Sequence, residues 1–287
     1  MRKQISIFLQ KYLENKNSKV VKKIYLKNKD FYINKSLKFD LSIISTKLWY
    51  KVFRSKSIVI QPNFLDKNSI ININNKIKIL TDYSFDFMNS NDRIIEKDNV
   101  VYQKGSTIYN NHKKIYDLGK CLVLVRDDFD KGMIDIFNFE LLFEKNELDF
   151  IRFKIQELST NLSLNISWGG FNAYVNNSII QTRGFHADSY SFRVKAFVYL
   201  TDVLKPEDGP YTFVYRSPLS DFLKLINRGL GYLLYKGTES LFFNKKAVVP
   251  IYGKAGTLII SDQSESHRGL PQGIGGSRAI LVINSGV

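Results

Sequence analysis

The first half of the chain shows two different patterns of hydrophobic and polar positions. Residues 1–16 carry apolar side chains at helical spacing, which predicts a short amphipathic helix, and residues 17–48 are irregular and rich in Lys and Asn. From residue 58 the pattern changes to short apolar or alternating runs separated by Asn, Asp and Gly, which predicts a β-meander. The runs lie at residues 58–60, 70–79, 100–102, 107–109 and 120–125.

The second half combines a helical stretch with further strands. Residues 135–162 have apolar positions near a helical period, and Asn146 is expected to separate two helices there. Residues 181–202 predict a strand, a turn and a second strand. Ser217 and Pro218 suit the N-cap and first position of a helix, so a helical insertion is expected at about 217–237. Further strands are predicted at residues 211–215, 247–251, 256–261 and 278–284.

These elements divide the chain into two parts. Residues 1–120 form an N-terminal helix and β-rich extension, and residues 121–287 form a mainly β core with flanking helices, an α+β arrangement. No linker rich in Gly, Ser or Pro separates the parts, which favours an extension of the main sheet over a free domain.

Composition sets few limits on the function. Hydrophobic residues make up 44% of the chain, as in an ordinary globular protein, and the one cysteine, Cys121, lies in an apolar run typical of the core. No apolar run approaches the length of a membrane span, and the opening run is too short for a signal peptide. We therefore expect a soluble cytoplasmic protein without a membrane partner; the sequence does not indicate an oligomeric state.

The net charge of +15 raises the question of a polyanionic partner. The lysines are spread along the chain among Asn and Ile, and no dense basic block alternates with aromatic residues. This distribution is typical of a solvated basic surface, so a nucleic-acid partner is not expected. The electrostatic field of this positive net charge would attract a small anionic substrate, such as a phosphorylated or carrier-linked metabolite.

The candidate chemistry lies in a few late residues. His186 and Asp188 are two apart on a predicted strand, so their side chains are expected to point to one face. His267 follows the apolar run at 256–261, and Arg278 follows eleven residues later. Two imidazoles and one carboxylate suit non-haem Fe(II) with positions left for a cosubstrate and O2. A nearby arginine suits the far carboxylate of a keto-acid. The third histidine, His112, lies in a polar turn and is expected to be uninvolved.

This ordered set resembles the phytanoyl-CoA dioxygenase family from about residue 170 to the C-terminus. The resemblance rests on His186-Ala187-Asp188, the run at 195–203, the Asp-Gly-Pro at 208–210, His267 and Arg278. It implies a double-stranded β-helix core (a jelly roll, cupin-like) and an Fe(II)- and 2-oxoglutarate-dependent dioxygenase. By this resemblance His186, Asp188 and His267 hold the metal, and Arg278 holds the distal carboxylate of 2-oxoglutarate.

The resemblance also implies the reaction, a hydroxylation that releases succinate and CO2. Relatives that halogenate have a small residue where this chain has Asp188, so hydroxylation or another oxidation is favoured. The chain departs from the family at residues 216–218 and at Gly269, where a small hydroxyl residue is common. Four further residues are candidates for substrate or cosubstrate contacts: Arg183, Tyr190, Lys195 and Arg216. The insertion at 217–237 is expected to cover the mouth of the barrel, where substrate is read.

Two alternative functions remain open. One is a catalytically silent β-helix protein that binds a metal and recognises a ligand. The other is a nucleic-acid-directed oxygenase with the same iron chemistry, which would need a lid that flips bases and a focused basic channel.

Overall fold

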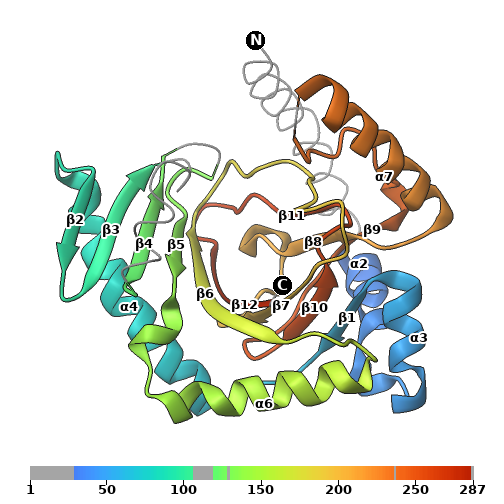
Figure 1. Ribbon diagram of the computed structural model, residues 1–287, viewed down its shortest axis with the longest axis horizontal. Coiled ribbons are helices and arrows are strands. Elements are labelled where there is room, and N and C mark those ends of the chain that lie inside the picture. Colours follow the sequence, from blue (N-terminus) through green and yellow to red (C-terminus); the bar gives the residue numbers. More distant parts are fainter. Residues whose placement is uncertain (1–28, 106–118, 128–129, 236, 286–287) are drawn as a thin grey trace.

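The computed structural model describes residues 29–105, 119–127, 130–235 and 237–285 (Figure 1). Within these residues the strands form two sheets of nine and three strands. In spatial order, the larger sheet contains β1 (Ile58–Gln61), β10 (Leu258–Asp262), β7 (Val194–Tyr199), β12 (Ser277–Ser285), β6 (Trp168–Asn177), β5 (Ile134–Phe137), β4 (Cys121–Arg126), β3 (Val100–Gly105) and β2 (Ile94–Lys97). The smaller sheet contains β11 (His267–Gly269), β8 (Tyr211–Val214) and β9 (Val248–Pro250).

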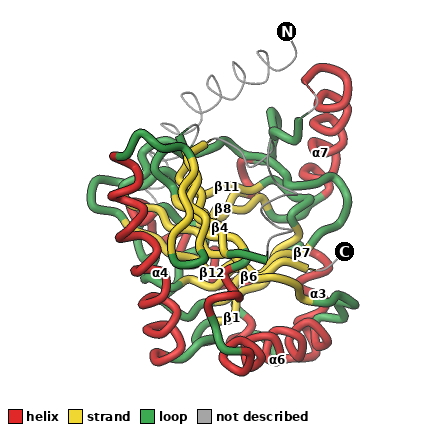
Figure 2. Tube along the Cα trace, turned by 60° about the vertical axis from the view of Figure 1, so that its left-hand side comes forward, coloured by secondary structure: helices red, strands yellow, loops and turns green. Residues whose placement is uncertain are grey.

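Helices flank the larger sheet (Figures 1 and 2). The α-helices are α2 (Lys29–Ser36), α3 (Thr46–Lys56), α4 (Lys67–Asn89), α6 (Lys145–Asn161) and α7 (Pro218–Leu230). The short helical turns are η1 (Leu37–Phe39), η2 (Leu41–Ile43), η3 (Phe139–Leu142), η4 (Pro206–Asp208), η5 (Gly231–Tyr235) and η6 (Lys245–Ala247). In both views α7 lies away from α4 and α6. The chain thus has the mainly β, jelly-roll fold with flanking helices that the sequence predicts.

Alternation along the central strands builds two cores. On β7, Ala196 and Val198 face the helices α4 and α6, while Phe197 and Tyr199 face the smaller sheet. β12 follows the same rule, so its buried run fills both layers. Cys121, on β4, is buried in the helix-side core, where burial raises the pKa of its thiol to about 12. The layer between the two sheets is the one that leads to the candidate site.

The run at residues 70–79, predicted as strand, is helical. It lies inside α4, whose buried positions include Ile73, Ile77 and Leu80 at helical spacing. Asp66 caps the helix by accepting a hydrogen bond from the backbone N–H of Ser69 at 2.9 Å. The apolar face of α4 packs on the sheet, so tertiary burial outweighs the β propensity of its isoleucines.

The stretch at 135–162 also differs in part from the prediction. Residues 134–137 form β5, and the first expected helix is the short turn η3. The second is α6, with Leu148, Ile151 and Ile155 buried as expected. The capping box of α6 joins Glu144 and Glu147, so the helix begins just before Asn146 rather than after it. The predicted helix at 1–16 and strand at 107–109 lie outside the described residues.

The larger sheet crosses the predicted boundary at residue 120. β1 pairs antiparallel with β10, and β3 pairs parallel with β4. Residues before the boundary therefore extend the sheet that carries the later strands. Among the described helices, none combines the length and the apolar character that a bilayer crossing requires.

Candidate metal centre

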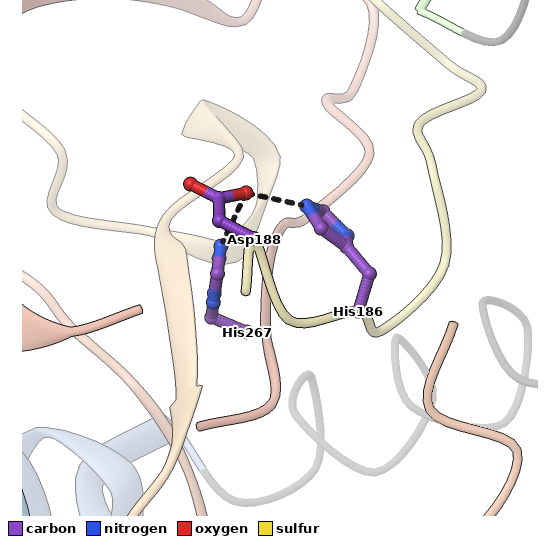
Figure 3. Close-up of side chains that lie close together, drawn as sticks. All are labelled: His186, Asp188 and His267. Atoms are coloured by element: carbon purple, nitrogen blue, oxygen red, sulfur yellow. Dashed lines mark ion pairs between the residues drawn. The ribbon is translucent and has the colours of Figure 1, made fainter. Parts of the chain in front are cut away.

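The side chains of His186, Asp188 and His267 lie close together (Figure 3). His267 begins β11, and His186 lies opposite it in the loop between β6 and β7. The two residues exchange backbone hydrogen bonds, with N···O distances of 3.1 Å from the His186 N–H and 2.9 Å from the His267 N–H. The backbone N–H of Asp188 donates to the carbonyl of Gln263 at 2.9 Å. These bonds fix the loop against the strand region that carries the second histidine.

The stretch that contains His186 and Asp188 is therefore not the regular strand that the sequence predicts. Residues 181–193 are irregular, apart from two isolated bridges that join His186 to Glu239 and to His267. Strand alternation cannot be the reason that the two side chains converge. They converge because backbone pairing on either side of Ala187, whose own N–H donates to the carbonyl of Thr238 at 2.9 Å, holds the loop in place.

Both imidazoles have one fixed orientation. The Nδ1 of His186 lies 2.8 Å from the carbonyl oxygen of Gly184, and the Nδ1 of His267 lies 2.9 Å from that of Glu265. A carbonyl can only accept, so each Nδ1 carries the proton and each Nε2 presents a lone pair. The two Nε2 atoms lie 3.8 and 3.6 Å from Oδ1 of Asp188. One ligand atom from each residue lies within 4.8 Å of the others, which is the spacing of a metal site.

The charges of the site favour metal ligation. Burial alone would raise the pKa of Asp188, but Lys195 and the two histidines hold that pKa well below its usual range. Nζ of Lys195 donates to Oδ2 of Asp188 at 2.5 Å and leaves Oδ1 turned toward the imidazoles. Burial, with Arg183 as the next cause, lowers the pKa of His186 well below its usual range. A neutral imidazole and an ionised carboxylate are the forms that bind a metal.

Arg278 lies on β12 with its side chain buried. Its guanidinium donates to the carbonyl of Gly209, and its Nη2 lies 3.4 Å from Oδ1 of Asn176. Gly209 has φ of +71°, and a Cβ there would lie 2.7 Å from the carbonyl oxygen of Leu270, so the turn that meets Arg278 requires glycine. Burial lowers the pKa of Arg278, and no carboxylate in the described residues forms an ion pair with it. A buried guanidinium of this kind is ready for an anionic ligand.

These residues surround a cavity of about 190 Å³. Pockets for drug-sized ligands usually measure about 300–1,000 Å³, so this cavity suits a small molecule. Five cationic and two acidic side chains line it. The full lining comprises Arg126, Asp130, Met133, Tyr174, Asn176, Thr182, Arg183, His186, Asp188, Lys195, Phe197, Tyr211, Gln263, His267, Arg268, Gly269, Arg278 and Ile280.

The four predicted contact residues divide into two groups. Arg183 and Lys195 line the cavity, Arg183 with an ion pair to Glu239 at 3.0 Å. Because residues 181–193 are irregular, strand alternation does not decide which way the side chain of Arg183 points. Tyr190 and Arg216 do not line the cavity. Tyr190 instead lines a separate cleft with α7.

The prediction for Arg216 therefore needs correction. Its guanidinium is exposed and forms an ion pair with Asp221, 3.3 Å from Oδ1, on the first turn of α7. No residue of the segment 217–237 lines the cavity either, so the insertion does not form its wall. The segment reaches the site indirectly, where Nζ of Lys224 lies 3.2 Å from Oε1 of Glu265.

Sequence reasoning missed a polar group behind His267. The Tyr211 hydroxyl and the Ser261 hydroxyl are 3.0 Å apart, and the Gln263 amide donates to both, at 3.2 and 2.7 Å. The ring of Tyr211 lies 5.7 Å from the imidazole of His267, and burial raises its pKa. No motif marked these residues, because strand pairing rather than sequence spacing brings them together.

Arg268 and Arg126 also line the cavity and were not predicted from the sequence. Arg268 is fully buried next to His267 and donates to the Thr182 hydroxyl at 2.8 Å. Arg126 binds the buried carboxylate of Asp135 at 2.6 Å. The position of Arg268 directly after His267 is the one signal that could have found it. His112 lies outside the described residues.

Comparisons with known proteins connect this chain to solved structures of the same fold. No family model and no curated protein matches the sequence. Among solved structures, the chain is similar to SnoN, described as a non-haem α-ketoglutarate-dependent epimerase from nogalamycin biosynthesis, with a TM-score of 0.52 and 12% identity over 84% of this chain and 82% of SnoN. It is also similar to EvdMO1, with a TM-score of 0.52 and 14% identity over 84% of this chain and 50% of EvdMO1. This chain therefore spans about half the length of EvdMO1. These likenesses establish a shared fold.

Proposed function

We propose that this chain is a non-haem Fe(II)- and 2-oxoglutarate-dependent dioxygenase that hydroxylates a small anionic metabolite and releases succinate and CO2. The observation that carries the proposal is the convergence of His186, Asp188 and His267 in a cavity that also holds Arg278. We further propose, from the motifs quoted above, that its relatives are the phytanoyl-CoA dioxygenases. The description of SnoN as α-ketoglutarate-dependent supports the general class.

The donor set fits Fe(II). Two imidazole Nε2 atoms and one carboxylate oxygen form the three-ligand arrangement that leaves positions open on non-haem iron. Both rings are already oriented by backbone carbonyls, as metal-bound imidazoles normally are by their second nitrogen. When bound, iron supplies the oxidising chemistry with 2-oxoglutarate and O2 as co-reactants.

The other residues of the cavity bind and orient. Arg278 would hold the distal carboxylate of 2-oxoglutarate through its planar fork. Lys195 fixes Asp188 by binding the oxygen that faces away from the imidazoles. Phe197, Met133 and Ile280 supply an apolar wall that excludes water from the reacting atoms.

The charge of the cavity favours an anionic substrate. Its five cationic side chains exceed its two acidic ones, and the net charge of +15 steers anions toward the molecule. Because the cavity measures about 190 Å³, only a small reacting portion of the substrate would enter beside the cosubstrate.

Metal analysis of three variants tests the proposal. We expect purified protein to bind one Fe(II), and His186→Ala, Asp188→Ala and His267→Ala each to lose it, because each removes one of three donors. Conversion of 2-oxoglutarate to succinate without added substrate should disappear in the same variants. His112→Ala is the matched control, since it also removes an imidazole, and it should keep both metal and turnover.

The same experiment distinguishes the alternatives. Full metal occupancy in His267→Ala would contradict the ligand set. Stoichiometric iron without any succinate in the unmodified protein would favour the catalytically silent binding protein instead.

A further inference from the structure

The helix α7 packs with its polar side inward. Its buried residues are Ser220 and Asn227. The Ser220 hydroxyl donates to the carbonyl of Tyr215 at 3.1 Å. The Asn227 side chain makes two hydrogen bonds to the backbone of Phe242, of 2.6 and 3.0 Å. Because each of these polar groups has a partner, the inward face is fully compatible with burial.

The apolar side of the same helix faces solvent. Phe222 is 59% exposed, Leu225 is 65% exposed and Tyr232, in the following turn η5, is 82% exposed. Phe222 and Leu225 are three apart and share one face of α7, and Tyr232 lines the same cleft as Leu225. Together with their exposed neighbours they form what we call the apolar stripe: Leu219, Phe222, Leu225, Tyr232 and Leu233. A contiguous exposed apolar surface of this kind marks an interaction site.

Exposed cationic residues lie on α7 and on the segment that packs against it. Arg228 is exposed on α7 itself, and Lys245 and Lys246 are exposed on η6. The turn before η6 is joined to the start of α7, where the Asn244 amide donates to the hydroxyl of Ser217 at 3.2 Å. Phe242, half exposed, adds a further aromatic side chain between the two elements.

We propose that the apolar stripe inserts into the surface of an anionic lipid bilayer. A helix with an outward face of Leu and aromatic side chains, bordered by Lys and Arg, lies in the plane of a membrane interface. The net charge of +15 complements an anionic surface. The same charge disfavours a second copy of this chain as the occupant, because two strongly cationic molecules repel each other. The helix would lie on the bilayer without crossing it.

This inference does not depend on the proposed enzyme activity. Three residues of the apolar stripe, Leu225, Tyr232 and Leu233, line a cleft of about 1050 Å³ together with Tyr190. An apolar small molecule in that cleft is the competing occupant. A second copy of this chain, bound to the apolar stripe, is another competing occupant.

Flotation with lipid vesicles tests the proposal. We expect the protein to float with phosphatidylcholine vesicles that contain phosphatidylserine, and to do so weakly with phosphatidylcholine alone. Phe222→Ser with Leu225→Ser should weaken the partition by about tenfold or more, because two apolar side chains no longer insert. Lys245→Gln with Lys246→Gln should weaken it by about fivefold per lysine, with less salt sensitivity.

A control variant outside the apolar stripe, together with metal content and succinate formation, shows whether a loss of flotation is specific to the stripe. Phe153→Ser removes an exposed aromatic residue on α6 and should float like the unmodified protein. Metal content and succinate formation should be unchanged in the stripe variant, which separates this test from that of the active site. Equal flotation of the stripe variant and the unmodified protein would overturn the proposal. Absence of flotation of the unmodified protein would also overturn it. If light scattering then shows that the unmodified protein is a dimer and the stripe variant is a monomer, the apolar stripe is the contact between two copies of the chain.

Discussion

Gly269 leaves the space in which the guanidinium of Arg278 lies. A Cβ at this position would be 2.7 Å from Nη2 and 3.1 Å from Nη1 of Arg278. The resemblance to the phytanoyl-CoA dioxygenases led us to expect a small hydroxyl residue here, but the guanidinium of Arg278 occupies the space that its side chain would need. The departure noted in the sequence therefore has a steric reason.

Replacement of Gly269 by Ser should weaken 2-oxoglutarate binding by about tenfold, because the added side chain displaces the charged fork from its position. Metal content should stay unchanged, since Gly269 holds no ligand. Anaerobic titration, followed by the metal-to-ligand absorption band, measures the affinity. Gly229→Ser is the control, because no atom lies within 4 Å of its added Cβ. An unchanged affinity in Gly269→Ser would move the anchor of the distal carboxylate away from Arg278.

At the scale of single residues, the sequence predicted which side chains come together but not the backbone contacts that bring them together. His186, Asp188 and His267 come together as expected, and the ordered set that they form with Arg278 along the chain was enough to find them. The reason given for the first two, strand alternation, was wrong, because backbone bonds from distant loops hold them. Tyr211 and Gln263 could not be found, since only the folded sheet brings them beside His267.

At the scale of elements, α4 shows how a cap and a burial pattern decide between strand and helix. Its isoleucines and asparagines gave short apolar runs that favoured a strand. The N-cap at Asp66 and the spacing of the buried positions are both helical signals, and they extend over 23 residues. A short window hides this period, whereas the whole segment reveals it.

Asp66→Ala should lower the free energy of unfolding by about 1 kcal/mol at neutral pH, because the first turn of α4 loses its cap. Hydrogen bonds from the Ser69 backbone N–H and then its hydroxyl lower the pKa of Asp66 in the folded state. The contribution of the ionised carboxylate is therefore present above the unfolded-state pKa and is lost as pH falls through the folded-state pKa. Denaturant titrations at neutral and acid pH should show the difference between the two proteins shrinking in acid.

Asp66→Asn is the matched variant for this prediction. An amide oxygen can still accept from the Ser69 backbone, so most of the stability should remain and little pH dependence should be seen. If Asn destabilises the protein as much as Ala, the cap is not the source of the effect.

The helix α7 lies within the insertion predicted at about 217–237. Its orientation could not be predicted, because an amphipathic pattern does not say which face turns inward. The expectation of no membrane partner rested on the absence of a spanning segment. The outward apolar face of α7 leads us to revise it toward surface binding.

At the scale of the molecule, the larger sheet continues through both predicted parts. β1 covers the edge of β10, and α4 packs its apolar face on the strands of the later part. Removal of the first part would therefore expose strand edges and a large apolar face. The division at residue 120 stays a prediction about organisation, and the pairing makes independent folding of the second part unfavourable.

A fragment of residues 121–287 should lack a cooperative thermal transition, because it loses the partners of β10 and β4 and much of the helix-side core. Circular dichroism and calorimetry of the fragment and the full chain make the comparison. A sharp transition in the fragment, close to that of the full chain, would show that residues 121–287 are a separate folding unit.

The mutual backbone bonds of His186 and His267 have a consequence for the timing of metal capture. His186 and His267 are far apart in the chain, but the entropy cost of closing the loop between them is incurred when the sheet forms, before a metal binds. An arriving ion would find its nitrogen donors already assembled, unlike the small domains that fold only around their metal. Uptake and release should then proceed without refolding, so a chelator would empty the site while the secondary structure persists.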